Sequence, residues 1–213
     1  MTGATTPSTV SPTRARLRVA AGLVASGAVV GLVWALLAPP IHGVVALTRG
    51  GDRVKIALGS EADHWFTAAA LFHGMLCVLA VVAAVLAWQW RAHRGPAMTA
   101  VLSIGAIGAA GAAAGVGALV ARWRYGSVDV ATAPVSEDRR VHYVTEAPAV
   151  FFGHTPLQIA LTLLLPAAVI AIVYVLAAVS TPRDDLGAWP PVDDPVVFTD
   201  RIGTAADVPP AAR

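Results

Sequence analysis

The sequence contains a single cysteine, Cys77, among 213 residues. One cysteine excludes an intrachain disulfide and a cysteine-rich metal site, and its apolar neighbours indicate a small buried hydrophobic residue. Charged residues are also scarce: they form 13% of the chain, against about a quarter in a typical soluble domain. The net charge is only +2 and the basic residues are scattered, so nucleic acid is not an expected partner.

Motifs that carry chemistry are missing as well. We find no Walker loop, HExxH pair, nucleophile elbow or dinucleotide fingerprint. The long apolar stretches contain no ionisable carboxylate, which pumps and ion-coupled transporters normally keep inside their helices. A homo-oligomeric pore is weakly supported, because no face is polar along its length. We therefore predict neither enzyme activity nor a cofactor.

What is present is a set of four uncharged apolar stretches, at residues 19–38, 65–90, 97–121 and 156–179. About 20 helical residues cross a hydrocarbon core of about 30 Å, and a charge at mid-helix costs about 2.5–3.5 kcal/mol. The sequence therefore predicts an all-α integral membrane protein, a multi-pass bundle of four transmembrane helices over residues 14–180, surrounded by the lipid bilayer. Residues 1–13 and 181–213 are predicted to be disordered tails.

The connection at residues 91–96 is long enough only for an antiparallel helical hairpin. The large loops at residues 39–64 and 122–155 then share the opposite side. Basic residues near the stretches are balanced between the two sides, so their sum predicts no orientation. The triplet Arg14, Arg16 and Arg18 precedes the first stretch, which favours a plasma-membrane protein with both termini in the cytoplasm.

The first loop contains a β-hairpin pattern, with residues 44–47 and 54–58 flanking the turn TRGGDR. We expect it to lie outside the cytoplasm, on the outer membrane surface. An isolated hairpin is marginally stable, so it should pack on the second loop or on a partner chain. The run VHYVTE at residues 141–146 could add a third strand.

Glycines mark two possible packing faces. Gly108, Gly111 and Gly115 lie within about 60° of one another on a helix, and Gly27 and Gly31 are spaced for close approach in the first stretch. Such faces let helices dock in lipid. They serve either packing within the bundle or contact with a membrane-protein partner or a second copy.

Histidines are the remaining candidates for chemistry. His73 is the only one inside an apolar stretch, and a lone histidine cannot give bis-histidine haem ligation. We interpret it as a hydrogen-bonded structural residue rather than a haem ligand or proton acceptor. His42, His64, His142 and His154 lie in the large loops, where they could converge on zinc or copper or sense pH. Their spacing matches no metal motif, so we predict no metal site.

Several segments together resemble a known family. They are RGGDRVKIALGSEADHWF, VLAWQWRAHRGP, VHYVTEAPAVFFGHTPLQIA, LLLPAA and TPRDDLG. They are similar to conserved actinobacterial membrane proteins best represented in mycobacteria, and the resemblance covers about residues 15–190. That family has no known function, so the resemblance implies a four-span layout and a mycobacterial-type cell membrane, and it transfers no catalytic residue.

These observations favour a non-enzymatic accessory or interaction protein of the cell envelope or of a membrane complex. The alternative is an enzyme or carrier acting at the outer face on a lipid-linked or metal substrate. It would use the loop residues His64, Asp63, Glu61, His142 and His154.

Overall fold

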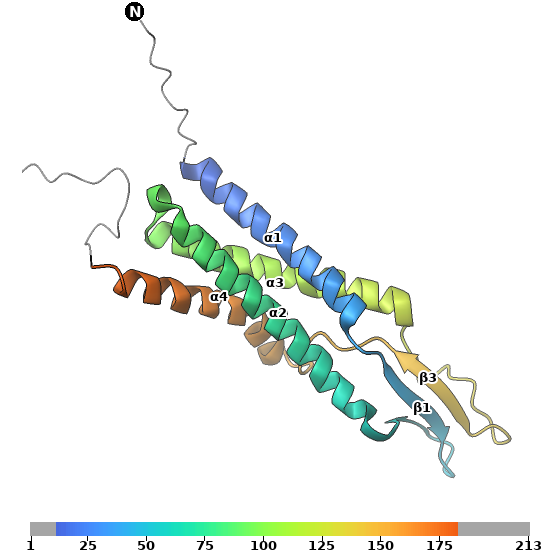
Figure 1. The fold of residues 1–213 in the computed structure, drawn as a ribbon. Coiled ribbons are helices and arrows are strands. Elements are labelled where there is room, and N and C mark those ends of the chain that lie inside the picture. The colour runs from blue at the N-terminus through green and yellow to red at the C-terminus, as the bar shows by residue number, and fades with distance from the viewer. Residues whose placement is uncertain (1–11, 183–213) are drawn as a thin grey trace, which may run out of the picture.

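The computed structural model describes residues 12–182, which form four long helices and one small sheet (Figure 1). By length and composition, each of these four helices could cross a membrane. The tails predicted at both ends fall almost entirely outside the described residues. The elements in chain order are α1 (Pro12–Leu37), β1 (Ile41–Leu47), β2 (Arg53–Ala57), η1 (Gly59–Glu61), α2 (Ala62–Gln89), η2 (Arg91–His93), α3 (Pro96–Tyr125), β3 (Val141–Glu146) and α4 (Pro156–Val179).

Helix boundaries follow local signals in the sequence. Thr155 and Gln158 form a reciprocal capping box at the start of α4, and Pro156 occupies the first turn. Gly95, with φ 136°, precedes Pro96 at the start of α3, because glycine alone adopts that backbone conformation at low cost. α4 continues through Pro166 as a single helix, although proline cannot donate the usual backbone hydrogen bond.

The four helices form one elongated bundle. α1 lies along α3, α4 contacts α2 and α3, and α1 meets α2 near the sheet. The first and last described residues and the turn between α2 and α3 lie at one end, and the sheet lies at the other (Figure 1). The α2–α3 connection is therefore an antiparallel helical hairpin, as predicted, and the two large loops lie at the same end of the bundle.

The closest helix contact joins α1 to α3 through small residues. A Cβ atom added at Gly27 would lie 2.2 Å from the carbonyl oxygen of Ala109, and one at Gly31 would lie 2.2 Å from that of Ala113. Each glycine therefore lies directly against the backbone of α3. Such proximity maximises van der Waals contact between helices.

Of the two uses expected for the glycine face of α3, packing within the bundle accounts for little of it. A Cβ placed at Gly108 would lie 3.1 Å from Cγ2 of Val24, whereas nothing within residues 12–182 comes within 4 Å of a Cβ placed at Gly111 or Gly115. The glycines of α3 that are buried against α1 are Gly105 and Gly117. Because almost every residue in this part of α3 is small, glycine spacing could not select the face.

The sheet has three antiparallel strands in the order β2-β1-β3. The predicted hairpin is confirmed, and the run VHYVTE pairs with β1 as the third strand. Val45 of β1 is fully buried with Ala133 and Val135 of the second loop. The sheet extends beyond the helix ends, in continuation of α1 (Figure 1).

Candidate functional site

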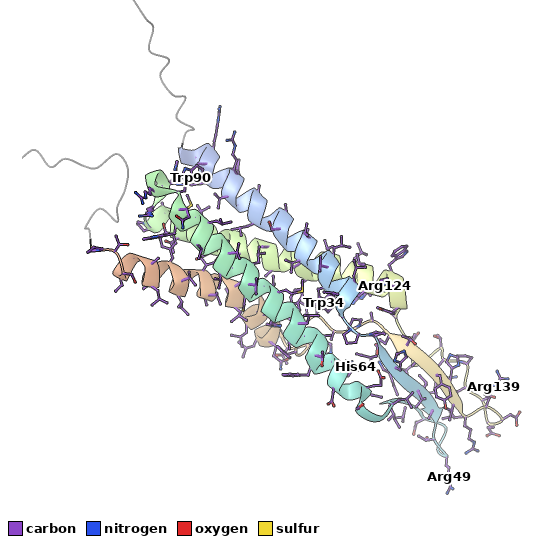
Figure 2. All side chains as sticks on the ribbon, in the orientation of Figure 1. Trp34, Arg49, His64, Trp90, Arg124 and Arg139 are labelled. Carbon is purple, nitrogen blue, oxygen red and sulfur yellow. The ribbon has the colours of Figure 1, made fainter. Side chains whose placement is uncertain are left out.

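A cluster of two histidines and one carboxylate joins the sheet to α2. Oε2 of Glu61 lies 3.1 Å from the backbone nitrogen of His42, 3.2 Å from its Nδ1 and 2.9 Å from Nδ1 of His64. His64 Nδ1 also lies 3.1 Å from the carbonyl oxygen of Pro40. Since a carbonyl only accepts, this nitrogen carries a hydrogen. One carboxylate oxygen of η1 thus contacts both the start of β1 and the first turn of α2. Figure 2 shows His64 on α2.

The charge of Glu61 is stabilised by this geometry. Glu61 precedes the uncharged stretch that begins at Trp65. The hydrogen bond from the backbone amide of His42 lowers the pKa of Glu61, and the His42 ring and the nearby His64 act in the same direction. Partial burial raises the pKa of Glu61, but by less than these contacts lower it. The carboxylate is therefore held ionised as a hydrogen-bond acceptor.

The other loop candidates are not part of this cluster. His142 pairs with Val45 across the sheet, on the face opposite to His42, and His154 is exposed just before α4. Asp63 is exposed at the start of α2. Within residues 12–182, no three His, Cys, Asp or Glu residues are placed to hold a metal ion together. Of the five loop residues considered for an outer-face site, the structure brings Glu61 and His64 into contact, while His142 lies on the other face of the sheet from His42.

An ion pair missed by the sequence analysis lies on the inner face of the sheet, the face that carries Val45. Lys55 of β2 reaches across β1 to Glu146 of β3, and both side chains are about a quarter exposed. Gly43 lies between these strands without a side chain to separate the partners. A pocket of about 310 Å³ lies here beside Trp65. No sequence signal links residues 91 positions apart.

His73 connects α2 to α4. Its Nδ1 lies 2.7 Å from the carbonyl oxygen of Ala69, and its Nε2 lies 3.1 Å from Oγ1 of the buried Thr162. Because a carbonyl oxygen only accepts, Nδ1 donates to Ala69, and the hydroxyl of Thr162 donates to the carbonyl oxygen of Gln158 at 3.0 Å. The hydrogen bonds expected for His73 are present, and its purely structural role stays a prediction. The sequence did not predict Thr162 as the partner of His73, because nothing in it indicated which hydroxyl His73 would contact.

The outer face of the sheet, opposite the face that carries Val45, has two apolar cross-strand rows that the other described residues leave partly exposed. Ile56, Val44 and Tyr143 form one cross-strand row, and Val54, Ala46 and Val141 form the next. Among these, Ile56 is 54% exposed and Tyr143 is 72% exposed. Contiguous exposed apolar surface is uncommon on soluble surfaces and marks interaction sites. We call these six residues the outer-face patch.

Together, the helices and the sheet define a class: a mostly helical protein with four apolar helices of membrane-spanning length and a small three-stranded sheet at one end. The chain belongs to the family described as "Protein of unknown function (DUF2567)", whose model matches residues 23–188. The resemblance to a conserved actinobacterial family of unknown function is thereby confirmed.

Curated relatives come from mycobacteria and are themselves uncharacterised. The chain is 58% identical to Uncharacterized protein Rv1591 of Mycobacterium tuberculosis over 173 residues, covering 81% of this chain and 90% of the relative. It is 49% identical to Uncharacterized protein ML1222 of Mycobacterium leprae over 178 residues, covering 83% and 90%. No solved structure matches the chain at a significant level.

Proposed function

We propose that this protein is a multi-pass plasma-membrane protein that binds another envelope protein through the outer-face patch. It acts as an accessory or interaction protein rather than as an enzyme. The observation that carries the proposal is the uncovered apolar face of the sheet, which leaves Ile56 and Tyr143 more than half exposed.

Membrane insertion is supported by how charge is distributed along the helices. The 15 basic and 13 acidic residues all lie outside the four uncharged stretches. Many large apolar side chains on the helices point away from the bundle, among them Val78, Leu86, Ile104, Leu161 and Leu176. Hydrocarbon is the solvent in which such a surface is stable.

The proposed orientation places both termini in the cytoplasm and the sheet outside. It rests on the arginine triplet before the first uncharged stretch and on the position of the sheet at the opposite end of the bundle (Figure 1). Arg49 and Arg139 lie at the far tip of the sheet, and Trp90 lies at the other end of the bundle (Figure 2). In this orientation the outer-face patch faces partners in the envelope.

Aromatic and aliphatic side chains dominate the fully buried centres of protein interfaces, with Tyr enriched there. Tyr143 is the most exposed member of the patch and shares a cross-strand row with Val44 and Ile56. A partner that covers this row removes apolar area from water. Each 100 Å² covered contributes about 2.5 kcal/mol before the costs of association.

The test is purification of the full chain in a mild detergent after crosslinking in intact cells. A photoreactive phenylalanine analogue at Tyr143 should crosslink to one stoichiometric protein partner. Ile56→Asp should abolish co-purification of that partner, whereas Ser127→Asp, at an exposed loop position outside the patch, should retain it. A bare monomer under several extraction conditions, or a partner retained by Ile56→Asp, would contradict the proposal. If Tyr143 crosslinked only to lipid or to a second copy of the chain, that species would be the occupant of the patch in place of an envelope protein.

A further inference from the structure

A second pocket lies between α2 and α4, on the side of the bundle. Its volume is about 380 Å³, within the range of about 300–1,000 Å³ typical of ligand pockets. Leu161 and Leu164 on its rim are 58% and 49% exposed, so the pocket opens toward whatever surrounds the helices. Its walls are almost wholly apolar, and α4 supplies most of them: Leu161, Leu164, Leu165 and Ala168.

The polar groups of this pocket are grouped at its end nearest the sheet. Oε1 of Gln158 is occupied by the backbone nitrogen and hydroxyl of Thr155, at 3.2 Å and 2.9 Å. Its Nε2 donates no hydrogen bond to any residue in the part of the chain that the structure describes. His73 and Thr162 already bond to each other. The pocket therefore offers, on the exposed side chain of Gln158, an amide donor that has no acceptor among the described residues.

The dimensions of the pocket fit one leaflet of a bilayer. Gln158 and Ala168 are ten residues apart on one helix, which corresponds to about 15 Å at a rise of 1.5 Å per residue. This is half of a hydrocarbon core of about 30 Å. The ring of Phe152, which also lines the pocket, lies 4.6 Å from that of His73.

We propose that this pocket binds one acyl chain of a glycerolipid, with the ester carbonyl of that chain accepting a hydrogen bond from Nε2 of Gln158. The inference rests on the membrane placement proposed above. No lysine, arginine, aspartate or glutamate lines the pocket, so the charged headgroup stays outside it. The ester carbonyl is the polar group of the lipid that lies at the boundary between headgroup and chain, which is where Gln158 is placed.

The test uses the full chain in nanodiscs of phosphatidylcholine that carries a photoreactive diazirine in one acyl chain. After irradiation, mass spectrometry should find labels concentrated at residues 158–168 and at Phe152. Leu164→Trp fills the pocket and should lower this labelling severalfold. Leu176→Trp is the matched control, because Leu176 is 62% exposed on the same helix but does not line the pocket; it should leave the labelling unchanged.

Gln158→Glu tests the hydrogen bond without filling the pocket. Glutamate keeps the acceptor of the capping box, so α4 should begin as before, while the amide donors are lost. Labelling in the pocket should fall about two- to tenfold, as expected for the loss of one hydrogen bond. Equal labelling around α4, unchanged by Leu164→Trp, would overturn the lipid site but leave the membrane placement intact. An absence of label from all four helices would overturn both.

Discussion

Replacing Gly27 by alanine tests whether direct backbone contact holds α1 against α3. The new Cβ would lie 2.2 Å from the carbonyl oxygen of Ala109, whereas ordinary contacts lie at 3.4–4 Å. Neither helix backbone can give way locally, so the two helices must move apart by about 1 Å or more, and the neighbouring contact at Gly31 would loosen with it. Overpacking of this kind costs about 1–3 kcal/mol, so the Gly27→Ala protein should be less stable by that amount.

The matched control is Gly22→Ala on the same helix, where a Cβ would meet nothing within 4 Å in the described structure. Alanine favours the helix by about 0.8–1.0 kcal/mol over glycine, so this variant should be unchanged or slightly more stable. Unfolding in a titration of SDS into mild detergent, followed by tryptophan fluorescence, measures both. Equal stability of Gly27→Ala and Gly22→Ala would refute the inferred helix contact.

Three further predictions concern hydrogen bonds between elements. Trp34→Phe should lower the free energy of unfolding by about 1–3 kcal/mol, because it removes the 2.8 Å bond from Nε1 to the buried carbonyl of Ala68; the same SDS titration measures this, and an unchanged midpoint would contradict it. Arg124→Gln should increase amide hydrogen exchange in the last turn of α1, whose carbonyls its guanidinium caps at 3.0 and 3.3 Å, whereas Arg122→Gln should not. The lowered pKa of Glu61 means that its stabilisation is present above the ordinary titration range of glutamate and is lost as pH falls through the folded-state pKa. The protection of amides at the start of β1, measured against their intrinsic exchange rates at each pH, should therefore fall in acid, and Glu61→Gln should remove this dependence; an identical acid response in that variant would refute the role of the carboxylate.

The four helices, and the starts of α3 and α4, could be predicted from local sequence, whereas α1 begins at Pro12, seven residues before the uncharged stretch. Uncharged stretches of sufficient length, the Thr155–Gln158 capping box and the Gly95-Pro96 pair each act over a few residues, so the chain itself contains the necessary information. The hairpin was predictable for the same reason, since its strands flank a glycine-rich turn. Even the pairing of VHYVTE with β1 could be suggested from its β-prone residues, although its register could not.

Contacts between distant residues were not predictable in the same way. The sequence places His64 near Glu61 but gives no sign that His42, rather than His142 or His154, would share that carboxylate with it. Their meeting depends on how β1 follows α1 and turns back toward α2, which no spacing rule describes. The choice of Gly105 and Gly117 as the packing glycines of α3 likewise depends on how α1 is rotated about its axis.

The sequence by itself determined where the chain is helical, which segments exclude charge and which family it belongs to, because these properties follow from local composition. Only the tertiary structure decided which faces are covered and which stay open: the outer-face patch, the pocket beside Gln158, and the joining of Lys55 to Glu146 across β1. Burial depends on the packing of elements that are distant in the chain, and many arrangements of four apolar helices satisfy the same local pattern.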